Sequence, residues 1–282
     1  MTRRRFLVVG SLAMMALLAA SAGGANLSFK RQMASEVDAL FAESDPAASA
    51  LVAESDLAGL PAPVQRWLLA SGVVGRERPF AVRLKQEGEF RLSEDRGWMP
   101  YQAELYFTTY PPGFVWIASF EMAPLVSIAG RDRYQGGVGD IDMRLLGIIP
   151  VAKKSGGGLN QGALHRYLGE IVWFPAAALD PSIRWDAIDD SSALATMSSG
   201  GGQVSATFVF DDQGRLVSLS ADRYNDDRGS IEPWSISVAE YGAFGGIEIP
   251  VAGEGIWHYA SGDFSYIHWR ITDLEQNVPA AY

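Results

Sequence analysis

An alternation of apolar and charged residues from Phe80 to Leu92 sets the strongest limit on how this chain can fold. One set of alternate positions carries Phe80, Val82, Leu84, Phe90 and Leu92, and the intervening set carries Arg83, Lys85, Glu87, Glu89 and Arg91. A period of two is typical of a β-strand that buries one face and exposes the other. The sequence therefore predicts an antiparallel sheet with one wet side.

Strand-like runs recur as far as the hairpin predicted around residues 261–263, and Gly-rich turn signals at 199–202 and 245–246 separate several of them. Helical spacing appears at residues 29–44, after Pro61 or Pro63 up to Gly72, and around His165. We predict a mainly β (α+β) fold, a large curved antiparallel sheet of half-barrel shape with a few helices packed on it. A single β-rich domain is expected over 57–282, preceded by a helix and linker over 26–56.

The first 25 residues are expected to be a signal peptide or a membrane anchor. Arg3, Arg4 and Arg5 are the only charges in the first 22 residues, and an apolar run from Phe6 to Ala20 follows them. Thr2 to Leu7 resembles a twin-arginine export signal. The uncharged stretch is also long enough to cross a bilayer as a helix. Both readings place the body outside the inner membrane, in the periplasm or anchored to the outer side of that membrane.

Charge and composition exclude several classes of function. The net charge is −10, so removal of the three N-terminal arginines would leave −13, and such a body repels nucleic acid. No cysteine is present, which excludes disulfides and thiolate metal sites. No motif for a cofactor was found, and none is expected.

The helix around His165 is the first candidate for chemistry. Arg166 and Glu170 stand four residues apart and can pair on one helix face. His165 and Glu170 stand five apart and point away from each other, so they cannot form a catalytic couple within one helix. The residues favour a packing helix with a polar rim over a catalytic one.

A C-terminal hairpin offers the other two histidines. If Ser261-Gly262-Asp263 forms its loop, His258 and His268 lie diagonally on one polar face, with Tyr266 opposite His258. A zinc site would need a third ligand, and a solvated polar face is the simpler interpretation. No Gly-x-Ser-x-Gly motif of a serine hydrolase is present.

The sequence feature that favours ligand binding is the set of aromatic residues on the predicted strands. A curved sheet that only a few helices cover can leave an apolar hollow, and such hollows hold ligands. Arg133 could hold an anionic head group at its rim. The residues expected to bind the ligand are Phe90, Phe114, Trp116, Arg133, Trp173, Trp257 and Trp269.

Several motifs resemble a bacterial family of conserved proteins of unknown function. They are DLAGLPAPVQRWLLASGVVG (56–75), PPGFVWIASF (111–120), GRDRYQGGVG (130–139), RYLGEIVWFPAAALD (166–180) and RITDLEQNVPAAY (270–282). The resemblance covers nearly the whole body and implies an N-terminal membrane segment, but no reaction or catalytic residues. More loosely, the expected architecture is similar to that of periplasmic lipoprotein-sorting carriers, and a fold does not imply a function.

Three hypotheses stay open. The first is a non-enzymatic envelope protein that binds a lipid, acyl chain or other apolar small molecule in the hollow, and contacts the inner membrane through its N-terminus. The second is an exported hydrolase or transferase in which His165 meets a strand carboxylate such as Asp189. The third is a structural or partner-binding envelope protein with a filled core.

Overall fold

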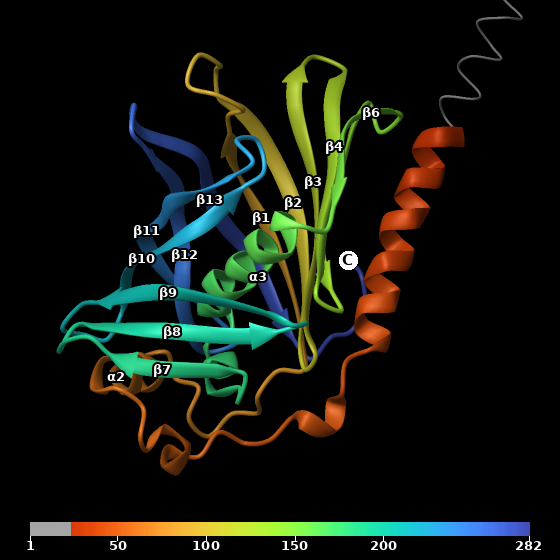
Figure 1. Cartoon of the computed structure of the whole chain (residues 1–282). Helices are drawn as coiled ribbons and strands as arrows, with labels where there is room; N and C mark the ends of the chain where they lie inside the picture. Colours follow the sequence, from red (N-terminus) through yellow and green to blue (C-terminus); the bar gives the residue numbers. More distant parts are fainter. Residues whose placement is uncertain (1–23) are drawn as a thin grey trace, which may run out of the picture.

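A computed structural model describes residues 24–282 and shows one 13-stranded antiparallel sheet that curls around a central helix (Figure 1). The strand order is β6-β5-β4-β3-β2-β1-β13-β12-β11-β10-β9-β8-β7. Every neighbouring pair is antiparallel. The predicted mainly β, half-barrel-like fold is confirmed.

The strands span Ala81–Phe90 (β1), Met99–Thr109 (β2), Pro112–Ala123 (β3), Val126–Gln135 (β4), Val138–Leu145 (β5), Ile149–Ser155 (β6), Ile183–Ala187 (β7), Ser192–Ser199 (β8), Gly202–Phe210 (β9), Leu216–Asn225 (β10), Ser230–Phe244 (β11), Ile247–Tyr259 (β12) and Gly262–Gln276 (β13). The helical segments after the N-terminal helix are η1 (Pro46–Ala48), η2 (Glu54–Leu57), α2 (Ala62–Ala70), α3 (Gly158–Glu170), η3 (Ile171–Trp173) and η4 (Pro175–Leu179).

The first strand in sequence lies at the middle of the sheet. β1 pairs with β2 on one side and with β13 on the other, so two wings extend from it, β2 to β6 and β13 to β7. The alternation in β1 has the predicted effect: Val82 and Leu84 are fully buried, while Lys85 and Glu87 are exposed.

Helix α3 connects the outer edges of the two wings through the concave side of the sheet (Figure 1). It packs against β3, β4 and β5 of one wing and against β9 and β10 of the other. The wings also meet directly, since the turns at Gly137 and Gly200 touch and the Tyr134 hydroxyl donates to the Ser199 carbonyl at 3.3 Å. The sheet therefore surrounds α3 on three sides.

The predicted second helix is confirmed as α2. Proline stands in its first turn, where no helical N–H partner is lost, and Gly72 at φ +75° follows its end. Its buried Trp67 packs against Trp185 and Phe208, with ring centroids 6.1 and 6.3 Å away. Through these contacts α2 covers part of the sheet formed by β7, β8 and β9.

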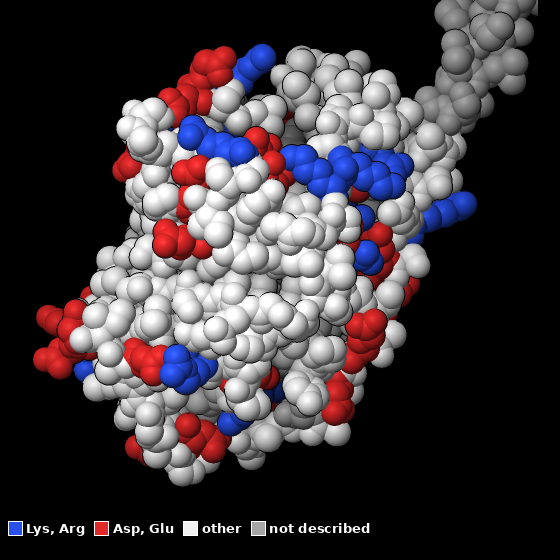
Figure 2. Space-filling view, viewed as in Figure 1, with Lys and Arg blue, Asp and Glu red and all other residues white. Residues whose placement is uncertain are grey.

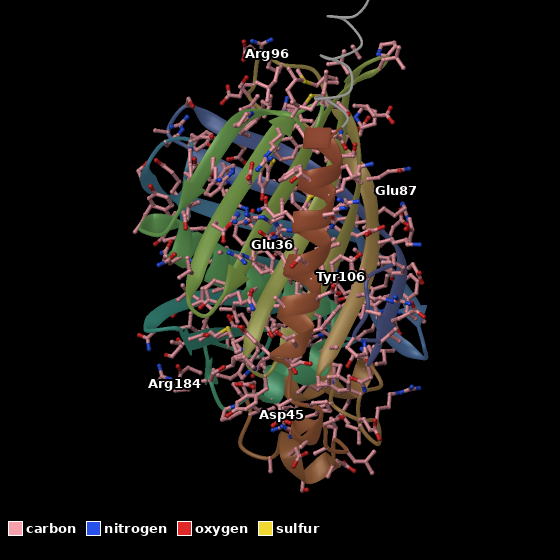
Figure 3. The ribbon with its side chains drawn as sticks, turned by 90° about the vertical axis from the view of Figure 1, so that its right-hand side faces the viewer. Glu36, Asp45, Glu87, Arg96, Tyr106 and Arg184 are labelled. Atoms are coloured by element: carbon pink, nitrogen blue, oxygen red, sulfur yellow. The ribbon has the colours of Figure 1, made fainter. Side chains whose placement is uncertain are left out.

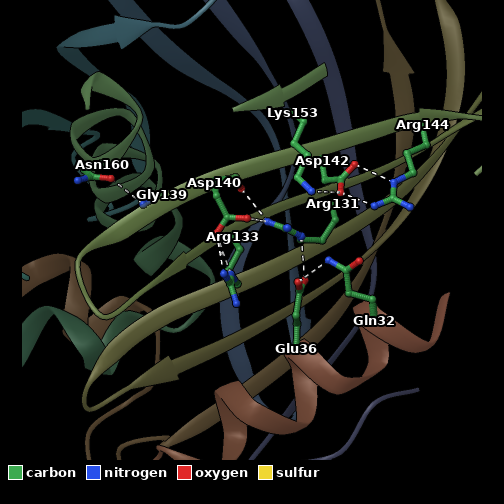
Figure 4. A network of polar contacts seen from close by, with 10 residues as sticks. All are labelled: Gln32, Glu36, Arg131, Arg133, Gly139, Asp140, Asp142, Arg144, Lys153 and Asn160. Atoms are coloured by element: carbon green, nitrogen blue, oxygen red, sulfur yellow. Dashed lines mark hydrogen bonds and ion pairs between the residues drawn. The ribbon is translucent and has the colours of Figure 1, made fainter. Parts of the chain in front are cut away.

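The N-terminal helix, residues 24–42, lies on the convex face of the sheet (Figure 3). Its Val37 and Leu40 pack with Tyr106 and Val115 in a small second core. The buried Arg131 joins the helix to the sheet, because its Nε lies 2.8 Å from the Glu36 carboxylate (Figure 4). The helix is therefore fixed to the wing by apolar contacts and by a charge pair.

Arg133 was expected at the rim of the ligand hollow, but it belongs to the same ion network as Arg131. Its guanidinium lies 2.8 Å from the Asp140 carboxylate, which also pairs with Arg131 (Figure 4). Side chains two residues apart on a strand share a face, so Arg133 faces the convex side together with Arg131. Arg133 is engaged outside the hollow and is not a rim residue.

The expected signal peptide or anchor falls on residues 1–25, and residues 1–23 lie outside the described part of the chain. Within residues 24–282, no helix combines the length and the hydropathy that a bilayer crossing requires.

The predicted register of the last hairpin is wrong. Tyr259 pairs with Gly262 and His258 pairs with Asp263, so the turn is two residues long and His258 does not face Tyr266. The register shifts between Gly255 and Ile256, and the extra residue on β13 is Tyr266. This bulge moves Tyr266 to the concave side, whereas the alternation had placed it with the histidines.

Candidate functional site

An aromatic cavity of about 370 Å³ opens on the concave side, where β1 and β12 end and β13 begins. We call it the mouth; its lining residues are Phe90, Arg91, Leu92, Ser93, Glu94, Asp95, Asp227, Arg228, Trp257, Tyr259, Phe264 and Tyr266. Trp257 and Tyr259 both line the mouth because alternate residues of β12 share a face, and Tyr266 lines it because of the bulge in β13. The volume lies at the small end of the range of ligand sites, roughly 300–1,000 Å³.

Two arginines of the mouth lie on aromatic rings. The Arg228 guanidinium is 3.4 Å from the Tyr259 ring centroid, and the Arg91 guanidinium is 4.9 Å from that of Phe264. Arg91 also donates from Nε to the Ser265 carbonyl at 2.7 Å. Glu94, Asp95 and Asp227 supply negative charge to the same rim, so it presents both signs and suits a polar or zwitterionic group.

The structure divides the remaining predicted ligand residues between the mouth and the core. Phe90 and Trp257 line the mouth. Phe114, Trp116, Trp173 and Trp269 are buried deeper, each at most 6% exposed. Trp173 packs against Trp269, with ring centroids 5.5 Å apart, and all four rings belong to the main buried core.

Several buried polar atoms in this core have no hydrogen-bond partner within the described residues. They are the Tyr101 hydroxyl, the indole nitrogens of Trp116 and Trp173, and one carboxylate oxygen of Glu170. The Tyr101 ring stands 6.3 Å from Trp116 and 5.8 Å from Phe120, which itself stands 5.2 Å from Phe90 at the mouth. The aromatic contacts therefore run without interruption from Phe90 at the mouth to Trp116 in the core.

A buried ion cluster lies on the same side of α3. Arg166 donates from Nε to Glu170 at 2.8 Å and from Nη1 to Asp132 at 2.6 Å. Its guanidinium lies over the rings of Phe114 and Trp116, at 4.9 and 4.8 Å. Burial raises the pKa of Glu170, and the Arg166 charge opposes that rise. The predicted pair of Arg166 and Glu170 exists, and it lies inside the protein.

A second cavity, of about 550 Å³, opens where β9 and β10 separate. Its lining is mixed: Gln161, His165, Leu194, Gln203, Val204, Ser205, Thr207, Ser220, Ala221, Asp222, Pro233, Trp234 and His258. β9 and β10 pair only from Leu216/Phe210 to Ser220/Thr207. The backbone N–H and C=O groups of the remaining residues on these facing edges therefore do not pair between the two strands.

Helix α3 satisfies these open edges with two side chains. His165 donates from Nε2 to the Ser205 carbonyl of β9 at 3.1 Å. Gln161 accepts from the Tyr224 amide of β10 at 2.8 Å. Burial, and next the nearby Arg223 charge, lower the pKa of His165 to about 4, so the ring is neutral near pH 7. His165 therefore closes a gap in the sheet.

Asp189, the proposed partner of His165, lies in the β7–β8 turn. Its carboxylate accepts from the Ser191 amide at 2.8 Å and from the Ser191 hydroxyl at 3.0 Å. Because the His165 ring is hydrogen-bonded to Ser205 instead, the structure does not join these two residues into a base and its orienting group.

A serine, a histidine and an aspartate form a relay that sequence spacing did not indicate. The His258 Nδ1 lies 2.7 Å from Asp263, and its Nε2 lies 2.7 Å from the Ser235 hydroxyl. An ionised Asp263 can only accept, so Nδ1 carries the proton and Nε2 accepts from Ser235. This is the hydrogen-bond order of a serine nucleophile, a base and an orienting carboxylate. Asp263 is 69% exposed, so water competes for its hydrogen bond.

Only part of this Ser235–His258–Asp263 arrangement could have been predicted from the sequence. His258 and Asp263 lie five residues apart across a two-residue turn, a spacing that a correct hairpin register would have revealed. Ser235 reaches them from β11 because Trp234 pairs with Trp257, and nothing in the local sequence sets that pairing.

Comparisons with known proteins give a family and distant structural likenesses. Residues 50–269 match a family described as a family of unknown function (DUF6544). No curated protein matches the chain. Among solved structures, the lipoprotein LppX of Mycobacterium tuberculosis matches with 13% sequence identity over 77% of this chain and 95% of its own, at a TM-score of 0.27. A TM-score this low does not establish a shared topology.

Proposed function

The chain belongs to the DUF6544 family of unknown function, and we propose that it binds an amphiphilic lipid whose acyl chain lies in the mouth. The observation that carries the proposal is a cavity of about 370 Å³ whose wall is formed largely by aromatic rings, with charged side chains at its rim. Its size suits one acyl chain rather than a whole diacyl lipid. The basic start and apolar run in residues 1–22 support a location of this binding in the cell envelope.

The energetics suit a chain that is held by its apolar surface. Rings from Phe90, Trp257 and Tyr266 provide apolar contact, and burial contributes roughly 25 cal/mol per Å². At the rim, Arg228 and Arg91 present guanidinium groups to a phosphate, while the neighbouring carboxylates suit an ammonium group. The mixed rim therefore favours a zwitterionic head group over a purely anionic one.

Substitutions at the mouth should reduce the amount of lipid that co-purifies with the full chain. Trp257→Ala removes one wall of the cavity, and loss of ~50–100 Å² of apolar contact weakens binding on the order of tenfold or more. Ser93→Trp fills the mouth from a surface loop without altering the core. Native mass spectrometry of protein extracted from its own membranes, with identification of the released lipid, measures both effects.

The matched control is Ser191→Trp. Ser93 and Ser191 are both turn serines whose hydroxyls donate to an aspartate two residues away, at 2.6 and 3.0 Å. Lipids held by an N-terminal membrane segment contribute equally to both variants. Equal retention by the Ser93→Trp and Ser191→Trp proteins would overturn the proposal, and a chain that carries no specific lipid would favour the partner-binding hypothesis.

A second candidate function is ester hydrolysis, which the 2.7 Å contacts of His258 with Ser235 and Asp263 favour. A fluorophosphonate probe should label the Ser235 hydroxyl, and Ser235→Ala should abolish the labelling. Ser237→Ala is the control, because Ser237 lies two residues along the same strand and its hydroxyl faces Glu254. A full chain that stays unlabelled after prolonged exposure to the probe removes this candidate.

A further inference from the structure

We propose that the end of the sheet formed by the β3–β4 and β5–β6 hairpins docks on the surface of a lipid bilayer. We call this region the docking end; its residues are Leu27, Met122, Leu125, Val126, Leu146, Ile149 and Val151. All of them are exposed, Leu125 at 98%, Ile149 at 55% and Val151 at 53%. A contiguous set of exposed apolar side chains marks an interaction surface, whereas scattered ones do not.

Topology brings these side chains together. β4 pairs with both β3 and β5, and Ile128 stands opposite Phe120 on one side and Leu145 on the other. The tips of the two hairpins are therefore neighbours at one end of the wing. The N-terminal helix begins beside them, because the Asn26 side chain donates to the Leu146 carbonyl at 2.8 Å.

Two leucines at this end occupy a costly backbone conformation. Leu125 has φ +65° and Leu146 has φ +56°, and Asn277 is the other non-glycine residue with positive φ in residues 24–282. The left-handed region favours glycine or asparagine, and a bulky residue there is a genuine outlier. Both leucines are exposed to water at these tips, so their side chains are available for contact with an apolar partner.

The start of the described chain favours a bilayer as the occupant. Residue 24 lies at the docking end, and Figures 1 and 3 both show the N-terminal helix entering there. The sequence before it, from Phe6 to Ala20, is a continuous apolar run after three arginines. A membrane reached by that run would lie beside the exposed hairpin tips.

Charge behind the tips is suited to lipid head groups. Figure 2 shows a row of blue side chains below white ones at the upper right of the molecule, whereas the upper left carries both red and blue side chains. Lys153 is 70% exposed and stands four residues after Ile149, roughly 13 Å along the strand. Lys30 and Arg31 are exposed on the first helical turns. Basic residues near an anionic surface add ~1 kcal/mol each.

Docking in this pose would bring the mouth to the bilayer. The loop between β1 and β2 lies at the same end as the start of the N-terminal helix, as the position of Arg96 in Figure 3 shows. That loop carries Arg91 to Asp95 of the mouth. The docking proposal rests on the exposed tips and stands whether or not the mouth holds a lipid.

The absence of native cysteine permits a clean test with the full chain. Leu125→Cys and Ile188→Cys each introduce one labelling site, the second at an apolar position of the β7–β8 turn that is 53% exposed and lies away from the docking end. Each protein carries an environment-sensitive fluorophore and is reconstituted in vesicles of phosphatidylethanolamine and phosphatidylglycerol that contain nitroxide-labelled lipid. Quenching should be several-fold stronger at position 125 than at 188.

A second variant separates docking by the tips from tethering by the N-terminus. Leu146→Asn combined with Ile149→Asn, in the Leu125→Cys protein, should reduce quenching toward the value at position 188. Asparagine tolerates the positive φ of Leu146, and Ile149 is an exposed residue at the start of β6, so neither change removes a buried contact. Equal quenching at positions 125 and 188 would overturn the proposal, as would burial of position 125 against a second copy or another protein without lipid quenching. Lipid retention by the mouth is measured separately, so the two proposals fail independently.

Discussion

Replacement of Arg166 by methionine is expected to lower the free energy of unfolding by about 3–5 kcal/mol. Methionine preserves the length of the side chain but removes the charge that holds Glu170 at 2.8 Å and Asp132 at 2.6 Å. Two carboxylates then remain in the interior without compensation, and burial already raises the pKa of Glu170. Urea titration followed by tryptophan fluorescence measures the change.

Two further proteins make the result specific. Arg184→Met breaks the exposed pair with Asp186, in which the arginine side chain is 71% exposed, and should cost less than about 1 kcal/mol. Arg166→Met combined with Glu170→Gln removes one of the two stranded charges and should recover part of the loss. A loss below 1 kcal/mol for Arg166→Met alone would contradict the assignment of a buried, structurally required ion cluster.

The second large effect is a pH dependence that His165 imposes on stability. The pKa of His165 is about 4 in the folded protein, against an ordinary value near 6.5, because burial and then the Arg223 charge disfavour the imidazolium. The unfolded chain therefore binds more protons between these two values. The contribution to stability is complete above pH ~6.5, is reduced by about 2 kcal/mol at pH ~5, and is reduced by about 3 kcal/mol at pH ~4.

His165→Gln isolates this contribution. The glutamine amide can still donate to the Ser205 carbonyl but does not titrate, so the variant should lose less stability than the native protein between pH 7 and pH 4. The control is His268→Gln, whose histidine side chain is 44% exposed. Parallel stability curves for the native protein and His165→Gln would show that His165 is not buried as a neutral ring.

The sequence predicted the class of fold because the responsible signals are local. Alternation in residues 80–92 requires a strand with one wet face, and the prolines and Gly72 bound helix α2 whatever surrounds them. The five-residue offset of His165 from Glu170 excluded a catalytic couple, and the structure agrees, since His165 contacts β9 and Glu170 contacts Arg166. Phe90 and Trp257, two of the residues expected to bind a ligand, both line the mouth.

The tertiary structure decided which residues meet. Alternation gives two faces but does not say which one faces α3, so Arg133 was placed at a ligand although it pairs with Asp140 under the N-terminal helix. One bulged residue, Tyr266, reversed the face assignment at the mouth. The relay of Ser235, His258 and Asp263 depends on the register of three strands, which no local pattern specifies.

The exposed residues Leu125 and Leu146 show the same difference between what the local sequence indicates and what the tertiary structure decides. Pro124 precedes Leu125 and Gly147 follows Leu146, but the run from Gly139 to Val151 reads as one strand, so the turn at Leu146 was not predicted. Their alignment at one end, next to the start of the N-terminal helix, follows from the pairing of β3, β4 and β5. Local chemistry determined the elements of this protein, whereas the meeting of distant side chains followed from sheet register and curvature, because contacts far apart in sequence are set by packing of the whole chain.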